Sequence, residues 1–340
     1  MGAPPLPRLY TKPYRSVADQ LILLRSRGME ITDEAAAHGC LERIGYYRLS
    51  GYWYPHRKSH VSVNPVTGVP LLHPATGRPS IIVEDDFRPG TTFQQVMDLY
   101  VFDKRLRLLF LDALERVEVA LRVDIALLLG ARDPWAHRNP EELHGRFTKV
   151  VDPRSQQIEY PRWLRRLDAI FDRSKDEFAK HFKQKYRGEF PPIWIAVELW
   201  DYGMLSVFLG GMKHADQAQL AAKYGLPRPE LLTTWIRSLN HIRNICAHHG
   251  RLWNRSPADQ IAPPKLGESA LLDHLAGDLL GLTRLYASAA AIQYMLRTIN
   301  PASSWGRRLQ ALCSTFPTSP PVSLDQAGFP SGWETLELWR

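Results

Sequence analysis

The chain has 340 residues, of which 44% are hydrophobic and 23% charged, so it is long enough for one large or two medium-sized globular domains. Its formal net charge of +8 favours a polyanionic partner such as nucleic acid. Three scattered cysteines argue against a disulfide framework, and the start of the chain lacks the apolar core of a signal peptide. No apolar run reaches about 18 residues, so we expect a cytoplasmic protein without a membrane span.

The N-terminal part combines a Pro-rich start with helical patterns. Residues 1–13 are expected to be disordered. Ser16 predicts the capped start of a helix that stops at Gly28, and a second helix follows up to about Ile44. We assign residues 14–90 to an N-terminal helical module.

An aromatic and basic segment follows these two helices. GYYRLSGYWYPHRK, residues 45–58, interleaves tyrosines and a tryptophan with Arg48, Arg57 and Lys58. Such a segment can stack on unpaired bases while its cations contact phosphate. Alternatively the rings pack inward, which we expect for most of them. Residues 58–90, rich in Pro, Gly, His and Ser, predict a loop or a small hairpin.

The strongest helical pattern covers residues 91–129. The segment has no interior Gly or Pro, its apolar residues recur at helical spacing, and Gly130 ends it. A helix of this length spans about 55 Å, so it either breaks once or forms the central rod of a helical bundle. On it, Glu118 and Arg122 are spaced as a favourable i, i+4 pair.

Two contrasting segments come next. Residues 162–188 predict a basic helix or helix pair whose candidate phosphate contacts are Arg165, Arg166, Lys183 and Lys185. The alternative is a solvated helix face, because acidic residues dilute the charge. Residues 191–211 are apolar almost throughout and predict one buried helix, in which Glu198 needs a partner such as an arginine.

The stretch LNHIRNICAHHGRLWNR, residues 239–255, gathers more groups that can move protons or bind phosphate than any other stretch of the chain. A helix is predicted between Pro229 and Gly250. At about 100° per residue its apolar residues share one face. The opposite face carries the polar residues Asn240, His241, Asn244 and His248, with Arg243 at the edge between the two faces.

This set of side chains suits RNA cleavage. The ribose 2′-OH can attack the adjacent phosphorus if a base removes its proton and an acid protonates the leaving oxygen, and a histidine can do either. An arginine can bind the developing charge, and an asparagine can orient the phosphate or the imidazole. One helix supplies one such histidine unless His241 or His249 is the second, so we expect a homodimer with a composite site. Beyond the helix, Arg251 and Arg255 can contact phosphate or cap the helix.

Other interpretations compete with catalysis. A histidine on a helix is more often a structural residue than a catalyst. A zinc site from Cys246 and the neighbouring histidines lacks the usual paired spacing, and Cys246 lies on the apolar face, where a buried thiol is usual. We therefore expect neither a metal nor a cofactor.

The remaining chain predicts more helix. A loop anchored by Trp253 leads to an apolar helix over residues 269–299, and a short final helix follows. We assign residues 91–315 to one helical domain and residues 316–340 to a poorly packed tail.

Several strings resemble the Abi-like (AbiD/AbiF-type) abortive-infection proteins of bacteria. Arg243-Asn244-x-x-x-His248 resembles the R-x4-H signature of HEPN-superfamily ribonucleases, and the longer string RNICAHHGRLWNR resembles the Abi-like proteins. The strings IGYYRLSGYWYP, LERVEVALR and PIWxxxE are similar to the same family.

The resemblance implies an all-α, HEPN-like helical bundle with an N-terminal helical extension and a loop or hairpin insertion. It implies a metal-independent endoribonuclease toxin that is active during phage attack. In that toxin His248 would be the general acid or base, Arg243 would bind the phosphate, and Asn244 would orient the phosphate or the imidazole. Glu118 or Arg122 would brace the imidazole, and an RNA or protein antitoxin would restrain the toxin. The alternative is a non-catalytic RNA-binding or scaffold module.

Overall fold

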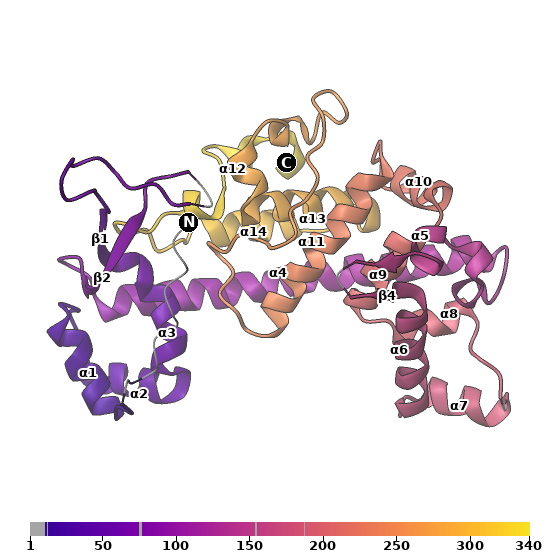
Figure 1. Ribbon diagram of the computed structural model, residues 1–340, viewed down its shortest axis with the longest axis horizontal. Coiled ribbons are helices and arrows are strands. Elements are labelled where there is room, and N and C mark those ends of the chain that lie inside the picture. Colours follow the sequence, from indigo (N-terminus) through magenta and orange to yellow (C-terminus); the bar gives the residue numbers. More distant parts are fainter. Residues whose placement is uncertain (1–10, 12, 75–76, 154, 187) are drawn as a thin grey trace. The chain divides into compact units, whose positions relative to one another are not determined.

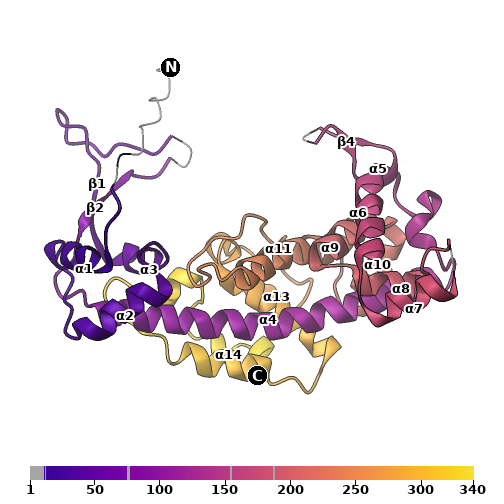
Figure 2. The same ribbon diagram turned by 90° about the horizontal axis from the view of Figure 1, so that it is seen from below.

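Figure 1 and Figure 2 show the computed structural model in two orientations. The structure describes residue 11 and residues 13–74, 77–153, 155–186 and 188–340. This described part is mostly helical, with two small two-stranded sheets, which confirms the all-α fold class. None of its helices combines the length and the apolar character that a membrane span requires. The disorder expected for residues 1–13 concerns residues that lie almost entirely outside the described ones.

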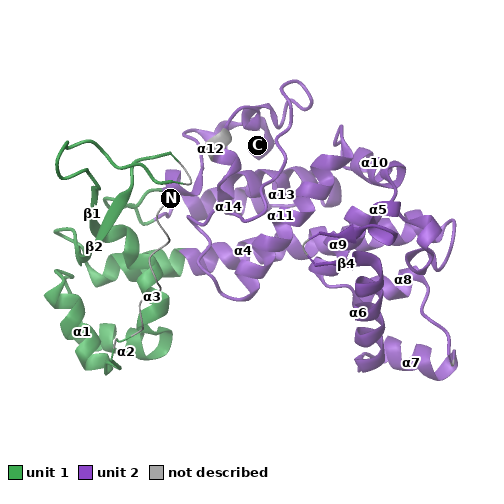
Figure 3. Ribbon diagram, in the orientation of Figure 1, with its two compact units in different colours: residues 1–102, 317–323 green, residues 103–316, 324–340 purple. Residues whose placement is uncertain are grey.

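The chain divides into two compact units, which Figure 3 colours separately. Unit 1 comprises residues 1–102 and 317–323, and unit 2 comprises residues 103–316 and 324–340. The long helix α4 (Phe93–Gly130) contributes its first residues to unit 1 and the remainder to unit 2.

Unit 1 is built from short helices and a hairpin. Its elements are α1 (Val17–Ser26), α2 (Glu34–Ile44), α3 (Tyr46–Trp53), β1 (Arg57–Val61) and β2 (Ile81–Phe87). Ser16 caps α1 in a reciprocal capping box with Asp19, as predicted. The antiparallel pairing of β1 with β2 confirms the predicted hairpin.

The aromatic segment of unit 1 divides between core and surface. Tyr52 and Trp53 are buried, and the ring of Tyr46 meets Trp53 edge-on with 4.8 Å between centroids. Tyr47 and Tyr54 are exposed. The expectation that the rings pack inward therefore holds for Tyr52 and Trp53 and is wrong for Tyr47 and Tyr54.

Unit 2 is organised along α4. This helix of 38 residues is continuous, so the rod is found and not the alternative of a broken helix, and it buries Leu106, Phe110, Val117, Leu121 and Ile125. The other elements of unit 2 are β3 (Val151–Asp152), β4 (Gln157–Ile158), α5 (Gly145–Thr148), α6 (Glu159–Arg173), α7 (Glu177–Lys185), α8 (Ile193–Ala196), α9 (Tyr202–Gly211), α10 (His214–Lys223), α11 (Pro229–Ala247), α12 (Leu279–Leu282), α13 (Leu285–Ile299) and α14 (Trp305–Cys313). The basic segment thus forms a helix pair, α6 and α7.

Side-chain contacts attach the neighbouring helices to α4. The indole Nε1 of Trp305 on α14 donates to the carbonyl of Leu109 at 2.8 Å. Lys223, at the end of α10, pairs with Asp124 of α4, and the hydroxyl of Tyr224 donates to the same carboxylate at 2.6 Å. These contacts fix α10 and α14 along the rod.

The predicted continuous helix over residues 191–211 is wrong. The chain breaks at Trp200, which is extended, and Asp201 then caps α9 by accepting from the N–H of Met204 at 2.8 Å. Aspartate favours a cap over a helix interior, since its carboxylate satisfies free N–H groups. Glu198 is exposed instead of buried, so the expectation that it needs an arginine partner is also wrong.

Two expectations for the C-terminal part need correction. The single helix predicted over residues 269–299 is instead the short α12 and, after a break at residues 283–284, the separate helix α13. Before α12, Gly277 adopts a left-handed conformation with φ of 84°. The tail over residues 316–340 is well packed instead of loose. Its rings Phe329, Trp333 and Trp339 surround Tyr286 of α13 with centroid distances of 5.2, 6.2 and 6.0 Å.

Two buried histidines predict acid sensitivity. Neither ring nitrogen of His56 or of His137 has a hydrogen-bond partner within the described residues. Burial, together with a nearby arginine in each case, lowers the pKa of His56 to about 4 and that of His137 to about 3.

Because the unfolded chain binds these protons below about pH 6.5 and the folded chain does not, stability is full above that pH and falls as the pH drops. We expect a lower Tm at about pH 5 than at about pH 7.5 in thermal denaturation. The double variant with His56→Asn and His137→Asn should show a smaller difference. An equal difference in both proteins would contradict this origin.

Candidate functional site

The predicted central helix is α11, and its end differs from the prediction. α11 stops at Ala247, so His248 is the C-cap residue. His249 follows with a left-handed φ of 57°. The N–H of Gly250 donates to the carbonyl of Ile245 at 2.8 Å, and that of His249 donates to Cys246 at 3.1 Å. This is a Schellman motif in which a histidine takes the place usually held by glycine.

The two faces of α11 are divided as predicted. Its apolar residues are buried, among them Leu232, Trp235, Leu239, Ile242 and Cys246. Asn244, His248 and His249 are exposed, whereas His241 and Arg243 are half-buried. An imidazole and an amide are therefore open to solvent at the end of one rigid helix.

A buried ion pair on α4 holds the backbone beyond this helix end. Asp103 and Arg107, one turn apart, form an ion pair whose side chains are 0% and 5% exposed. The Asp103 carboxylate accepts from the N–H groups of Leu252 and Trp253, the latter at 2.8 Å. Arg107 donates to the carbonyl of Gly250 at 3.3 Å. We call these interactions the Asp103 clamp.

The sequence analysis missed the Asp103 clamp, although a signal was present. Asp103 occupies a position in the otherwise apolar stripe of α4 between Leu99 and Leu106. A carboxylate on a core face must be paired, and an arginine stands four residues later. The predicted anchoring role of Trp253 is confirmed, because its side chain is fully buried and its ring meets Phe316 at 5.6 Å.

The charge of Arg243 acts on a carboxylate of α4. The side chain of Glu118 is only 12% exposed, and it accepts from Arg122 at 2.5 Å. Burial raises the pKa of Glu118, while the positive charges of Arg122 and Arg243 oppose that rise. Arg122 also donates to the carbonyl of Trp200. The predicted supporting residues Glu118 and Arg122 thus pair with each other, and the charge of Arg243 acts on Glu118.

Polar atoms near this pair lack partners. The hydroxyl of Tyr202, Oδ1 of Asn240 and Nε of Arg122 are buried without a hydrogen-bond partner in the described part of the chain. Burial raises the pKa of Tyr202 well above its usual value, and the charges of Glu118 and Arg243 act on the same hydroxyl. Unsatisfied buried groups are rare in folded proteins and often mark functional sites.

The remaining residues around α11 have defined places. Arg255 is exposed, and its guanidinium lies close to Gly250, since a Cβ on that glycine would come 3.6 Å from Nη1 of Arg255. Arg251 is half-buried. A cation therefore stands beside the helix end that carries His248.

The predicted phosphate contacts on α6 and α7 differ in availability. Arg165 is exposed, whereas Arg166 pairs with Asp201. Lys183 donates to three carbonyls at the end of α6, that of Phe171 at 3.1 Å among them, so its charge serves as a helix cap. The ammonium of Lys185 lies 5.3 Å from the ring centre of Tyr186.

In unit 1 the predicted contacts are partly paired. Arg48 is exposed. Arg57 pairs with Asp85 at 3.1 Å, and Lys58 lies 4.0 Å from Asp86. Arg48 and Lys58 therefore remain accessible to solvent.

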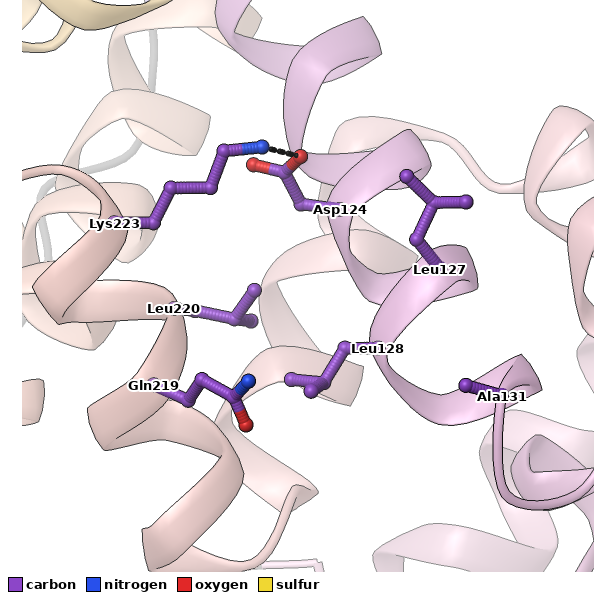
Figure 4. Close-up of a pocket in the computed structure, with 7 residues that line it drawn as sticks. All are labelled: Asp124, Leu127, Leu128, Ala131, Gln219, Leu220 and Lys223. Atoms are coloured by element: carbon purple, nitrogen blue, oxygen red, sulfur yellow. Dashed lines mark hydrogen bonds and ion pairs between the residues drawn. The ribbon is translucent and has the colours of Figure 1, made fainter.

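A cavity of about 370 Å³ lies between α4 and α10 (Figure 4). Its apolar lining comes from Leu127, Leu128, Ala131 and Leu220, and its charged groups, Asp124 and Lys223, pair with each other. The cavity takes no residue from α11, so it is separate from the candidate site.

Cys246 has the properties of a structural thiol. It is buried, and burial together with the charge of Asp103 raises its pKa to about 12. A thiol that stays protonated at neutral pH is a poor nucleophile. Among the described residues no three His, Cys, Asp or Glu side chains are grouped so that they could hold a metal ion.

Comparison with known proteins gives one family. The model of the family described as Abi-like protein matches residues 39–254, a range that contains Glu118, Arg243 and His248. No curated protein and no solved structure matches the chain.

The Asp103 clamp predicts a large loss of stability on Asp103→Asn. The amide keeps the shape but leaves the buried Arg107 without its counter-charge, and breaking a buried pair costs about 3–5 kcal/mol. Asp112→Asn is the matched control, because Asp112 on the same helix also pairs with an arginine four residues away but is partly exposed. We expect a loss under about 1 kcal/mol there. Urea unfolding measures both, and equal losses would argue against the clamp.

Proposed function

This chain belongs to the Abi-like protein family, and we propose that it is an abortive-infection toxin that cleaves RNA without a metal ion, as HEPN ribonucleases do. The family supports a role in abortive infection. The observation that carries the catalytic proposal is the end of α11, where His248 and Asn244 are exposed next to a half-buried Arg243.

In the proposed reaction the ribose 2′-oxygen attacks the adjacent phosphorus. A histidine takes the 2′-hydroxyl proton, the bond from phosphorus to the 5′-oxygen breaks, and that oxygen receives a proton. The products are a 2′,3′-cyclic phosphate and a 5′-hydroxyl. Arg243 binds the charge on the phosphate oxygens, and Asn244 orients the phosphate or the imidazole.

The proposal gives the supporting residues distinct tasks. The Asp103 clamp fixes the backbone that carries His248, since it holds Gly250, Leu252 and Trp253. Glu118 acts as a positioning residue for Arg243 through their opposite charges. The second proton-transfer group comes from a second copy of the chain or from His241 or His249. A homodimer with a composite site and an antitoxin that restrains it are parts of this proposal.

The alternative is a non-catalytic RNA-binding or scaffold module. A buried and hydrogen-bonded His248 would favour this non-catalytic function. The exposure of His248 supports catalysis instead.

The first test is cleavage of labelled RNA in EDTA. We expect wild type to produce 2′,3′-cyclic phosphate ends, and His248→Ala and Arg243→Ala to lose at least about a hundredfold in rate, as is typical for removal of an acid–base or charge-stabilising group. His214→Ala is the matched control, because His214 is also exposed in unit 2 but pairs with Glu230 in the first turn of α11, at the end of that helix opposite His248. It should cleave like wild type. Equal cleavage by His248→Ala and His214→Ala would remove His248 from the mechanism.

The positioning role of Glu118 has its own test. Glu118→Gln keeps the size of the side chain but removes the charge that faces Arg243, so we expect kcat/KM to fall about tenfold, equivalent to about 1.4 kcal/mol. Glu115→Gln changes an exposed carboxylate on the same helix and should have no effect. Unchanged kcat/KM in both variants would show that Arg243 does not depend on Glu118.

A further inference from the structure

Unit 1 contains a cleft of about 730 Å³ that takes no residue from the candidate site. It is formed by the segment before α1, by α1 itself, by the start of α3 and by β2, which supplies Asp85. Clefts of this size accommodate ligands with the bulk of a nucleotide. Its walls combine aromatic rings with guanidinium groups.

Two tyrosines of the cleft are almost fully open. Tyr14 is 93% and Tyr47 is 92% exposed. The neighbouring Tyr46 is fixed instead, since its ring meets Trp53 and its hydroxyl accepts from Arg27 at 3.3 Å. A rigid wall with open aromatic rings suits stacking on a flat aromatic ligand.

The charges around the cleft favour an anion. Arg15 is exposed, and Arg27 pairs with Asp85 at 2.7 Å. Arg57 pairs with the same carboxylate, so one negative charge faces several positive ones. Anionic groups are bound well by arginine forks.

The N-terminus of α3 opens onto the same cleft. Gly45 is its N-cap, and no side chain within the described residues caps it by a hydrogen bond. A Cβ on Gly45 would meet nothing within 4 Å, so the helix end is not covered. Free N–H groups and the positive end of the helix dipole attract phosphate.

Gln20 adds a hydrogen-bond acceptor. Its Nε2 donates to the carbonyl of Arg15 at 3.0 Å, which fixes the amide. Its Oε1 is buried and has no partner in the part of the chain that the structure describes. A fixed acceptor in a cleft can recognise the N–H edge of a base.

We propose that this cleft binds one unpaired nucleotide of an RNA strand, with the base stacked on Tyr47 or Tyr14 and the phosphate held by Arg15 and the N-terminus of α3. Its assignment as the place where the chain selects single-stranded substrate rests on the proposed ribonuclease function. A tyrosine ring stacks on any of the four bases, so the cleft selects unpaired strands and not a particular sequence.

The test is the binding of a labelled, unstructured RNA oligonucleotide to the full-length His248→Ala protein, followed by fluorescence anisotropy. Tyr47→Ala should weaken binding about 5- to 150-fold, the range that loss of one stacked base produces. Tyr47→Phe should bind normally, because stacking needs the ring and not the hydroxyl. Tyr54→Ala is the matched control, since Tyr54 is also exposed in unit 1 but does not line the cleft.

Equal affinity of the Tyr47→Ala and Tyr54→Ala proteins, or no binding of RNA to any of them, would overturn the proposal. Adenosine monophosphate serves as a second probe. If the binding of adenosine monophosphate depends on Tyr47 while the binding of the RNA strand does not, the cleft binds a free nucleotide and its assignment to RNA is wrong.

A parallel cleavage assay separates this inference from the proposed function. In the protein with an intact His248, Tyr47→Ala should raise KM and leave kcat unchanged. If RNA binding depends on Tyr47 but the wild-type protein cleaves no RNA, the proposed nucleotide cleft stands and the proposed ribonuclease function fails. If the Tyr47→Ala protein cleaves and binds RNA with the same KM and affinity as wild type, the ribonuclease function stands and the proposed nucleotide cleft fails.

Discussion

The buried ion pair between Asp103 and Arg107 is the interaction on which the candidate site depends. A helix end is normally the least ordered part of a helix, because its last carbonyls lack partners inside the helix. Here the N–H groups of His249 and Gly250 satisfy the carbonyls of Cys246 and Ile245. The neighbouring α4 then holds the chain just beyond the helix, because Arg107 donates to the carbonyl of Gly250 and Asp103 accepts two N–H groups that follow it. The exposed His248 therefore stands on a fixed backbone, which a group that transfers protons requires.

The same helix, α4, also carries Glu118, whose carboxylate interacts electrostatically with Arg243. Glu118 lies about four turns beyond Asp103 on α4, so one continuous rod serves both the histidine end of α11 and its arginine. This arrangement buries charges and leaves buried polar atoms without hydrogen-bond partners among the described residues, and both destabilise the fold relative to an apolar core. Such a concentration of buried polar groups around one helix supports a functional interpretation of α11.

Much of the fold could be predicted because its signals are local. The capping box at Ser16, the uninterrupted apolar spacing of α4 and the two faces of α11 all depend on residues close together in sequence. The break at Trp200 also had a local signal, the capping residue Asp201, but the apolar pattern around it favoured one continuous helix. Other failures involve contacts between distant segments. The packing of the tail depends on its aromatic rings, which contact Tyr286 more than forty residues earlier in the chain. No local sequence pattern predicts that contact.

The candidate site shows the same limit. Periodicity places Asn244 and His248 on the polar face of α11, but the exact helix end depends on the Asp103 clamp, which spans α4 and the loop after α11. The resemblance to a family suggested Glu118 or Arg122 as a brace for the imidazole, whereas in the structure the charge of Arg243 acts on Glu118. Charge interactions between helices leave no spacing signal in the sequence. The cleft of unit 1 needs three segments together, which sequence alone does not show.

The most direct test of this account is cleavage of one RNA strand in two forms, with a single 2′-deoxy nucleotide at the mapped cleavage position in one of them. Attack by the 2′-oxygen predicts that the all-ribose strand is cut at that bond and leaves a 2′,3′-cyclic phosphate, while the substituted strand is not cut there. Equal cutting of both strands would show that water or another nucleophile attacks the phosphorus. Cutting of neither strand would contradict the ribonuclease itself.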